Sequence, residues 1–305
     1  VNIIKGCNKC CSYCIVPFTR GKEKSRKMAE IVEDVRRLVE YQGVQEVTLL
    51  GQNVNSFGKE NGESLAGLIT ELDQINGLEL IRYTTSHPYD VSDELIAVHG
   101  SAKKLSRHLH LPVQSGSTTV LKRMLREYTA DHYMGLVEKL RAARPDIVLS
   151  TDIIVGFVDE TKEEFQATLD LLDRAQFDFI YSYTYSKREK TRAAKMVNSL
   201  TDDEKGERLR YLQLYQNKIQ EKVRQSIVGK TLTLLVTGHG FMGGVKKWKG
   251  RSNCNRIIHF LPENDEQNLE WHWVEVEVTS ATAFSCQGDL KKIWGKRMPE
   301  DAPRY

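Results

Sequence analysis

The segment Gly6-Cys7-Asn8-Lys9-Cys10-Cys11-Ser12-Tyr13-Cys14 places four of the six cysteines of this 305-residue chain within one short stretch. It follows the apolar residues 1–4, which have the composition of a β-strand. Cys7, Cys11 and Cys14 form a C-x3-C-x2-C pattern, and this spacing allows one tight loop to put thiolates on three irons of a four-iron cluster. The fourth iron is then left open, so we expect the amino and carboxylate groups of a bound molecule to chelate it.

Two other interpretations of the same cysteines remain. Cys7 with Cys10, and Cys11 with Cys14, form two C-x2-C pairs that could supply four sulfurs to one zinc ion. Structural zinc sites usually separate such pairs by roughly a dozen residues or more, whereas here the inner two cysteines are neighbours. Inert buried thiols are disfavoured by the polar residues between them. We therefore interpret Cys10 as a bystander.

The composition limits the classes of protein that the chain can belong to. At roughly 150 residues per domain, its length predicts about two domains. It has 40% apolar and 28% charged residues and lacks an apolar run near the roughly 18 residues that span a bilayer, so we expect a cytoplasmic protein without a membrane contact. The net charge of +3 is small, so any polyanion must bind to local patches. Because the first residue is Val1, we expect further sequence before it in the natural protein.

Strand-like and helix-like segments alternate over residues 1–225, which we expect to form the first domain. The expected strands are 1–4, 46–50, 79–84, 108–113, 148–155 and 179–185. The expected helices are 29–42, 65–75, 92–99, 118–126, 131–143 and 161–175. Six such repeats predict an α/β fold with a parallel sheet that is curled or closed into a partial or complete (β/α) barrel.

The pattern changes after residue 200. A charged helix is expected from Thr201 to about Ile227, followed by short strands at 231–237, 256–260 and 273–280. Residues 226–290 are therefore expected to form a small all-β barrel, and residues 291–305 a basic tail with two prolines.

The charges of this second domain are separated along the sequence. Residues 226–260 carry six Lys or Arg residues and no acidic residue, whereas residues 261–290 carry seven acidic residues and no basic one. A basic loop with one tryptophan suits RNA phosphates and base stacking, although a solvated basic hairpin is the alternative. The candidate RNA-binding residues are Lys246, Lys247, Trp248, Lys249, Arg251 and Arg256.

The C-x3-C-x2-C loop, with an aromatic residue before its last cysteine, resembles that of the radical S-adenosylmethionine superfamily. Residues 14–23 (CIVPFTRGKE), 49–56 (LLGQNVNS), 84–88 (TTSHP), 108–117 (HLHLPVQSGS) and 183–186 (YTYS) resemble the MiaB-type tRNA methylthiotransferases. This resemblance covers the chain to about residue 290. It implies a radical SAM barrel followed by a TRAM domain, which is a small RNA-binding β-barrel. It also implies addition of a methylthio group to carbon 2 of an N6-isopentenyladenosine beside the anticodon.

The resemblance further implies a set of cofactor-binding residues. Gly51, Gln52 and Asn53 match the loop that holds the amino group of the cofactor's methionine, although alone they indicate a turn after a strand. Tyr13 matches the residue that packs by the adenine, or it is a hydrophobic staple under the loop. Arg126 matches a residue that pairs with the cofactor's carboxylate, or it lies on a solvated helix face. Asp152, Val155 and Gly156 match positions that contact the ribose and adenine. Gln114 lies at a strand end, where barrel enzymes collect their site residues. His108 and His110 are expected to form hydrogen bonds within the barrel rather than to bind metal.

The chemistry of carbon 2 explains why such cofactors are needed. No side-chain base can usefully remove its hydrogen, so a radical is required. The expected cofactors are a 4Fe–4S cluster with one open iron and S-adenosylmethionine. The resemblance also implies a second 4Fe–4S cluster on an N-terminal domain that this chain lacks. We therefore expect this chain to be incomplete for the full reaction. The expected partners are a tRNA anticodon loop, a reductant such as flavodoxin or ferredoxin, and a sulfur donor, and we expect a monomer.

Alternative functions remain open at this point. Related methylthiotransferases act on threonylcarbamoyladenosine in tRNA or on a ribosomal-protein aspartate. A different class is a non-catalytic RNA-binding module whose cysteines hold zinc.

Overall fold

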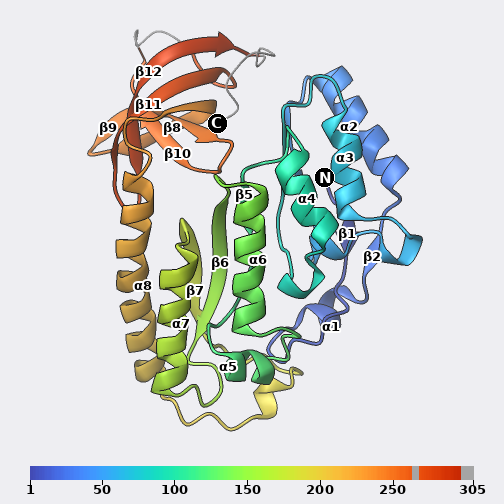
Figure 1. The fold of residues 1–305 in the computed structure, drawn as a ribbon, viewed down its shortest axis with the longest axis vertical. Helices are drawn as coiled ribbons and strands as arrows, with labels where there is room; N and C mark the ends of the chain where they lie inside the picture. The colour runs from blue at the N-terminus through green and yellow to red at the C-terminus, as the bar shows by residue number, and fades with distance from the viewer. Residues whose placement is uncertain (263–267, 297–305) are drawn as a thin grey trace. The chain divides into compact units, whose positions relative to one another are not determined.

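A computed structural model describes residues 1–262 and 268–296 of the chain (Figure 1). The chain forms two compact units, the first made of Val1–Leu105 and Leu109–Gln216 and the second of Ser106–His108 and Asn217–Tyr305. The boundary between the two units falls at Gln216, within helix α8 (Asp202–Gln225). The domain limits expected from the sequence, residues 225 and 290, stay predictions. No described helix combines the length and the apolar composition needed to cross a membrane.

The first unit is an open, curved arrangement of parallel strands. β3 (Glu46–Leu49) pairs with β4 (Leu80–Tyr83), and β5 (His108–His110), β6 (Val148–Val155) and β7 (Phe179–Thr184) form a second sheet in that order. Isolated parallel bridges continue the row, joining Asn2 to Leu50 and Ile81 to Leu105. Within the described residues, no pairing joins β7 back to the first strand, so the α/β barrel is partial. The first expected strand shrinks to β1 (Ile4–Lys5), which pairs with β2 (Lys24–Ser25).

Helices follow these strands and cover the outside of the curved sheets (Figure 1). They are α1 (Val16–Arg20), α2 (Met28–Gln42), α3 (Leu65–Asp73), α4 (Asp93–Ser101), α5 (Thr118–Arg123), α6 (Ala130–Ala143) and α7 (Lys162–Ala175). Helices α3 to α7 each begin at a Ser or Thr whose side chain accepts a backbone N–H, which satisfies one of the free donors of the first turn. The expected order of strands and helices is thus confirmed, with α5 ending three residues early.

The second unit contains a closed five-stranded barrel in the order β10-β12-β11-β8-β9. Its strands are β8 (Thr231–Met242), β9 (Val245–Ser252), β10 (Ile257–Phe260), β11 (Trp273–Ala281) and β12 (Cys286–Gly295). Two of these strands were not expected. β9 was taken for a basic loop, and β12 includes residues 291–295, so the expected tail was wrong there. The rest of that tail, residues 297–305, lies outside the described residues.

The barrel core is apolar and includes Cys286, whereas Cys254 is buried in the connection between β9 and β10. Cys254 and Cys286 are 7% and 2% exposed. Free cysteines of this kind behave as small hydrophobic residues, as expected for both.

Candidate active site

The cysteine loop lies between β1 and α1 and is held in place by backbone hydrogen bonds. The N–H of Cys7 donates to the carbonyl of Gly21 at 3.1 Å, and the N–H of Ser12 donates to the carbonyl of Met124 at 2.8 Å. The N–H of Gly6 donates to Oε1 of Gln52 at 2.7 Å. The loop is therefore fixed to segments that lie far away in the sequence.

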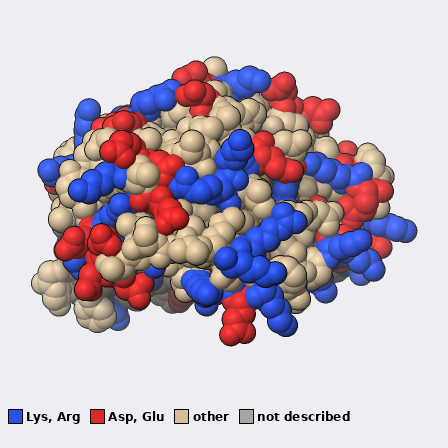
Figure 2. Space-filling view, turned by 90° about the horizontal axis from the view of Figure 1, so that it is seen from below, with Lys and Arg blue, Asp and Glu red and all other residues tan. Residues whose placement is uncertain are grey.

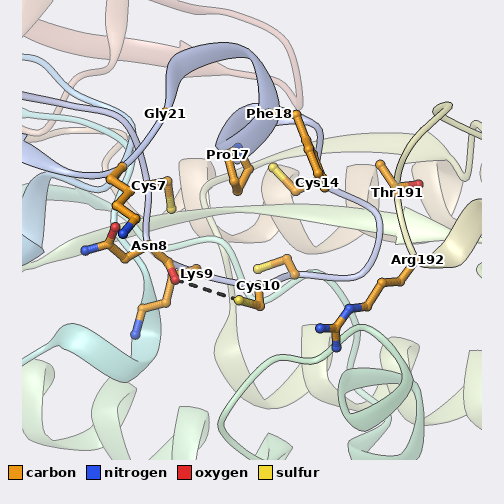
Figure 3. A pocket seen from close by; sticks show the side chains of 12 residues that line it. Cys7, Asn8, Lys9, Cys10, Cys14, Pro17, Phe18, Gly21, Thr191 and Arg192 are labelled. Carbon is orange, nitrogen blue, oxygen red and sulfur yellow. Dashed lines mark hydrogen bonds between the residues drawn. The ribbon is translucent and has the colours of Figure 1, made fainter.

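The predicted cluster ligands border one cavity of ≈ 280 Å³ (Figure 3). Cys7, Cys11 and Cys14 are each half-buried, whereas Cys10 is exposed and its Sγ lies 3.9 Å from the carbonyl of Asn8. The other residues that line the cavity are Asn8, Lys9, Cys10, Pro17, Phe18, Gly21, Lys22, Thr191 and Arg192.

These three thiols could hold a four-iron cluster. A four-iron cluster takes each thiolate on a different iron, so thiols spaced around one cavity fit it. Burial is the main cause that raises the pKa of Cys7 to about 11, and it also raises the pKa of Cys14. Ligation must therefore displace protons from these thiols.

A buried cation lies behind Cys11. The Nη1 atom of Arg126 is 3.5 Å from Sγ of Cys11, and its other donors reach the hydroxyl of Tyr128 and the carbonyl of Pro112. Arg126 is only 7% exposed, because α5 ends at Arg123 and Leu125 takes a left-handed conformation with φ 55°. The alternative of a solvated helix face for Arg126 was therefore wrong.

A histidine touches the same sulfur. The Nε2 atom of His87 lies 4.0 Å from Sγ of Cys11. Burial, followed by the charges of Arg126 and Lys9, lowers the pKa of His87 to about 2. Its imidazole is therefore neutral at physiological pH.

The predicted cofactor loop follows β3 and contains an unpartnered acceptor. Asn53 is 2% exposed, and its Nδ2 donates to Oδ2 of Asp90 at 2.8 Å and to Oε1 of Glu23 at 3.1 Å. Its Oδ1 atom is buried without a hydrogen-bond partner, which is unusual for a buried amide. An ammonium group could fill this acceptor. At Gly51, an added Cβ would lie 2.3 Å from Cγ2 of Ile4, so this position also requires glycine for packing.

Asp90 was not predicted from the sequence, although it connects these loops. Its side chain is 2% exposed and pairs with Nζ of Lys9 at 3.1 Å and Nζ of Lys59 at 2.7 Å. Lys9 belongs to the cysteine loop, and Asn53 to the predicted cofactor loop. No periodic pattern marks a buried carboxylate of this kind, which lies in the short 3-10 helix η3 (Pro88–Asp90).

The remaining predicted cofactor positions lie along β6 and its neighbours. Asp152 pairs with Nε2 of His110 at 3.3 Å, and Nδ1 of His110 lies 2.9 Å from Oγ of Ser150, so the expected hydrogen bonding of His110 is confirmed. Val155 is fully buried, and Gly156 takes a left-handed φ of 64°. Gln114 is buried and also left-handed, with its carbonyl accepting the N–H of Ile154.

Tyr13 lies beneath the cysteine loop. Its ring meets the ring of Phe157 edge-on at 6.3 Å, and it packs against the buried cluster around Met124 and Ala193. This contact agrees with the staple interpretation, and packing against adenine stays a prediction.

The candidate RNA-binding residues of the second unit need one correction. Trp248 is 6% exposed and belongs to the barrel core, and its ring lies 3.7 Å from that of His239. It is not available for base stacking, because β9 is a strand whose alternate side chains point inward. Lys246 is exposed, and Lys247, Lys249, Arg251 and Arg256 are half-buried.

The sequence and the fold identify the class of protein. The radical SAM superfamily model matches residues 1–172, and the chain belongs to that superfamily. It is 45% identical over 295 residues to the tRNA-2-methylthio-N(6)-dimethylallyladenosine synthase of Thermoanaerobacter sp. (strain X514). The aligned region covers 96% of this chain and 62% of that protein. The synthase of the same name from Acetivibrio thermocellus is 44% identical over 292 residues, covering 95% of this chain and 60% of that protein. The chain thus spans about three fifths of the length of these relatives.

A solved structure shares the fold. The radical S-adenosylmethionine methyltransferase TsrM from Kitasatospora setae superimposes with a TM-score of 0.52 at 16% sequence identity, covering 64% of this chain and 38% of that chain. The partial α/β barrel of the first unit is therefore a radical SAM fold.

Proposed function

We propose that this chain carries the radical SAM part of a tRNA methylthiotransferase that modifies carbon 2 of N6-isopentenyladenosine beside the anticodon. The observation that carries the proposal is the set of three thiols around one cavity, in a chain 45% identical to a synthase named for that reaction. We place the protein in the cytoplasm as a monomer that binds no membrane.

The residues around the cavity suit the two expected cofactors. Cys7, Cys11 and Cys14, which line the cavity, would hold the 4Fe–4S cluster. Asn53 does not line this cavity, but its buried, unpartnered Oδ1 atom would accept a hydrogen bond from the amino group of S-adenosylmethionine. When bound, the pair supplies one-electron cleavage of a sulfonium and hence a carbon radical that can abstract hydrogen. Hydrogen bonds to Gln52 and Met124 and the ion pair of Lys9 with Asp90 orient the cysteine loop.

The remaining cofactor contacts are part of the same proposal. Asp152 would accept the ribose hydroxyls once its contact with His110 is exchanged, and Val155, Gly156, Gln114 and Tyr13 would flank the nucleoside. Arg126 would pair with the cofactor carboxylate, and its contact with Sγ of Cys11 at 3.5 Å suggests that it also supports the cysteine loop.

The sulfur source and the partners belong to the proposal as well. We place a second 4Fe–4S cluster on sequence outside this chain, because the relatives are longer and the other cysteines here are Cys10, Cys254 and Cys286. The partners would be the tRNA anticodon loop, a flavodoxin or ferredoxin as reductant, and a sulfur donor.

Two assays test the proposal at separate levels. Anaerobically reconstituted protein with S-adenosylmethionine and dithionite should release 5′-deoxyadenosine, and the Cys7→Ala variant should not. The full-length protein should convert tRNA containing N6-isopentenyladenosine to its 2-methylthio product, as detected by nucleoside mass spectrometry. Modification of threonylcarbamoyladenosine tRNA or of a ribosomal protein instead would replace the proposed substrate. Colourless protein that binds one zinc ion and releases no deoxyadenosine would contradict the enzyme class.

A further inference from the structure

A basic segment borders the cysteine cavity and has no assigned role. Residues 187–195, here called the strap, follow β7 and contain five cations and one acidic residue. All five cations are exposed, and none pairs with a carboxylate in the described part of the chain. They are Lys187, Arg188, Lys190, Arg192 and Lys195.

The backbone of the strap is anchored at two residues, so the segment that carries the cations follows a defined path. Thr191 and Ala193 are each 1% exposed. The hydroxyl of Thr191 donates to the carbonyl of Arg188 at 2.7 Å, and the N–H of Ala193 donates to the carbonyl of Ser12 at 2.8 Å. The second bond ties the strap directly to the cysteine loop.

A second basic segment borders the same cavity from another side. Residues 20–24 contain Arg20, Lys22 and Lys24, all exposed and without a carboxylate partner among the described residues. The segment also contains Glu23, which is half-buried and accepts a hydrogen bond from Nδ2 of Asn53. Lys22 and Arg192 both line the cavity, so cations from two distant parts of the sequence meet at its edge. Figure 3 shows Phe18 at this edge, and its side chain is 63% exposed. The face drawn in Figure 2 carries groups of Lys and Arg interspersed with Asp and Glu.

We propose that the strap and residues 20–24 form a phosphate-binding rim for single-stranded RNA at the mouth of the cysteine cavity. Cations on more than one side of a cavity can contact consecutive phosphates while a nucleotide between them enters. The exposed ring of Phe18 offers a base-stacking surface, which an acidic protein partner would not require. The proposal rests on the proposed function for its choice of RNA and adds a second RNA-binding surface to that expected on the small barrel.

The test removes three strap charges that do not line the cavity. The variant Lys187→Gln/Arg188→Gln/Lys190→Gln is compared with Arg210→Gln/Lys218→Gln/Lys222→Gln, which removes three exposed charges from α8. Binding of an anticodon stem-loop RNA is measured by fluorescence anisotropy at several KCl concentrations. We expect the strap variant to bind about tenfold more weakly near 100 mM KCl, with a salt slope reduced by about two, since each single-strand contact contributes about 0.7. The α8 variant should change affinity less than threefold.

A charge-retaining variant controls for folding. Arg188→Lys together with Lys187→Arg and Lys190→Arg should restore both the affinity and the salt slope, because phosphate contacts depend mainly on charge. Restored affinity after loss in the Gln variant excludes a collapsed strap as the cause.

The possible outcomes separate this inference from the proposed function. If the strap variant binds RNA as well as the α8 variant, or if the unaltered chain binds no RNA, the inference is overturned. Retained RNA affinity with slower reduction by flavodoxin would assign the rim to an acidic protein and also overturn it. Weakened RNA binding by the strap variant, with no methylthio product from the full-length protein, would support the rim and reject the proposed function.

Discussion

Arg126 approaches the sulfur of Cys11, with Nη1 at 3.5 Å from Sγ. The guanidinium is buried and forms its other hydrogen bonds with the neutral groups of Tyr128 and Pro112. A buried cation is costly unless a negative charge lies near it. A cluster held by the three cysteines would supply that charge.

We predict that Arg126→Gln destabilises the fold and makes a bound cluster harder to reduce. Loss of charged hydrogen bonds should lower the free energy of unfolding by about 2–3 kcal/mol. Loss of a nearby positive charge should shift the reduction potential to a more negative value, because the reduced cluster carries more negative charge. Urea denaturation and a dye-mediated EPR titration measure the two effects. The exposed neighbour Lys122 provides the control Lys122→Gln, and an equal shift in that variant would refute the local role of Arg126.

We predict that Asp90→Asn disturbs the connection between the cysteine loop and the predicted cofactor loop. Removing one partner of a buried ion pair typically costs about 3–5 kcal/mol. Because Lys9 keeps its exposed partner Glu127 at 3.2 Å, we expect the cost of Asp90→Asn at the lower end of that range. A double-mutant cycle of Asp90→Asn with Lys9→Met should show coupling of about 1–2 kcal/mol. Lys59 is 58% exposed, so Lys59→Met alone should cost less than about 1 kcal/mol. If the two changes lower the free energy of unfolding additively in urea denaturation, Lys9 and Asp90 are not energetically coupled and the prediction is wrong.

The acid stability of the first unit should depend on Glu164. Burial opposes ionisation of this carboxyl, but hydrogen bonds from Arg123, Thr119 and the Thr161 N–H outweigh it and lower the pKa of Glu164 to about 2. Because the folded pKa lies below the unfolded value of 4.5, its contribution is present above pH 4.5 and is lost as the pH falls toward 2.

We therefore predict that Glu164→Gln lowers the free energy of unfolding near pH 6 and that this difference shrinks below pH 4.5. Urea denaturation at a series of pH values measures it. Glu138→Gln, on the surface of α6, reports the general effect of losing a helix carboxylate. A Glu164→Gln difference that stays constant from pH 6 to pH 3 would be inconsistent with the assigned hydrogen bonds.

We predict that Trp248 supports the small barrel instead of contacting RNA. Trp248→Ala should cost about 3–5 kcal/mol, as expected for a large aromatic side chain removed from a core. Lys246→Gln, at an exposed position of the same strand, should leave the unfolding transition nearly unchanged. Differential scanning calorimetry distinguishes the two. A Trp248→Ala protein with an unaltered transition and weakened RNA binding would restore the stacking interpretation.

The elements predicted best from the sequence were those with strong local signals. The cysteine spacing located the loop, and apolar periodicity located α3 to α7. By contrast, β9 was missed because its lysines alternate with inward-facing residues such as Trp248, a pattern that also suits a basic turn. β12 contains Gly288, whose added Cβ would lie 2.3 Å from the carbonyl of Glu277, so glycine there reflects strand packing rather than a turn.

The polar connections of the site could not be predicted from periodicity. Arg126 was placed on a helix because nothing in the local sequence showed that α5 ends at Arg123. Asp90 finds its partners Lys9 and Asn53 only when segments far apart in the sequence come together. Contacts of this kind depend on tertiary structure, which local propensities do not encode.

The measurement that tests the central claim most directly is the iron and sulfide content of single cysteine variants after anaerobic reconstitution. Cys7→Ala, Cys11→Ala and Cys14→Ala should each lose the cluster, whereas Cys10→Ala should retain about four irons per chain. Loss of metal in Cys10→Ala equal to that in the other three, with one zinc ion in the unaltered protein, would contradict the account.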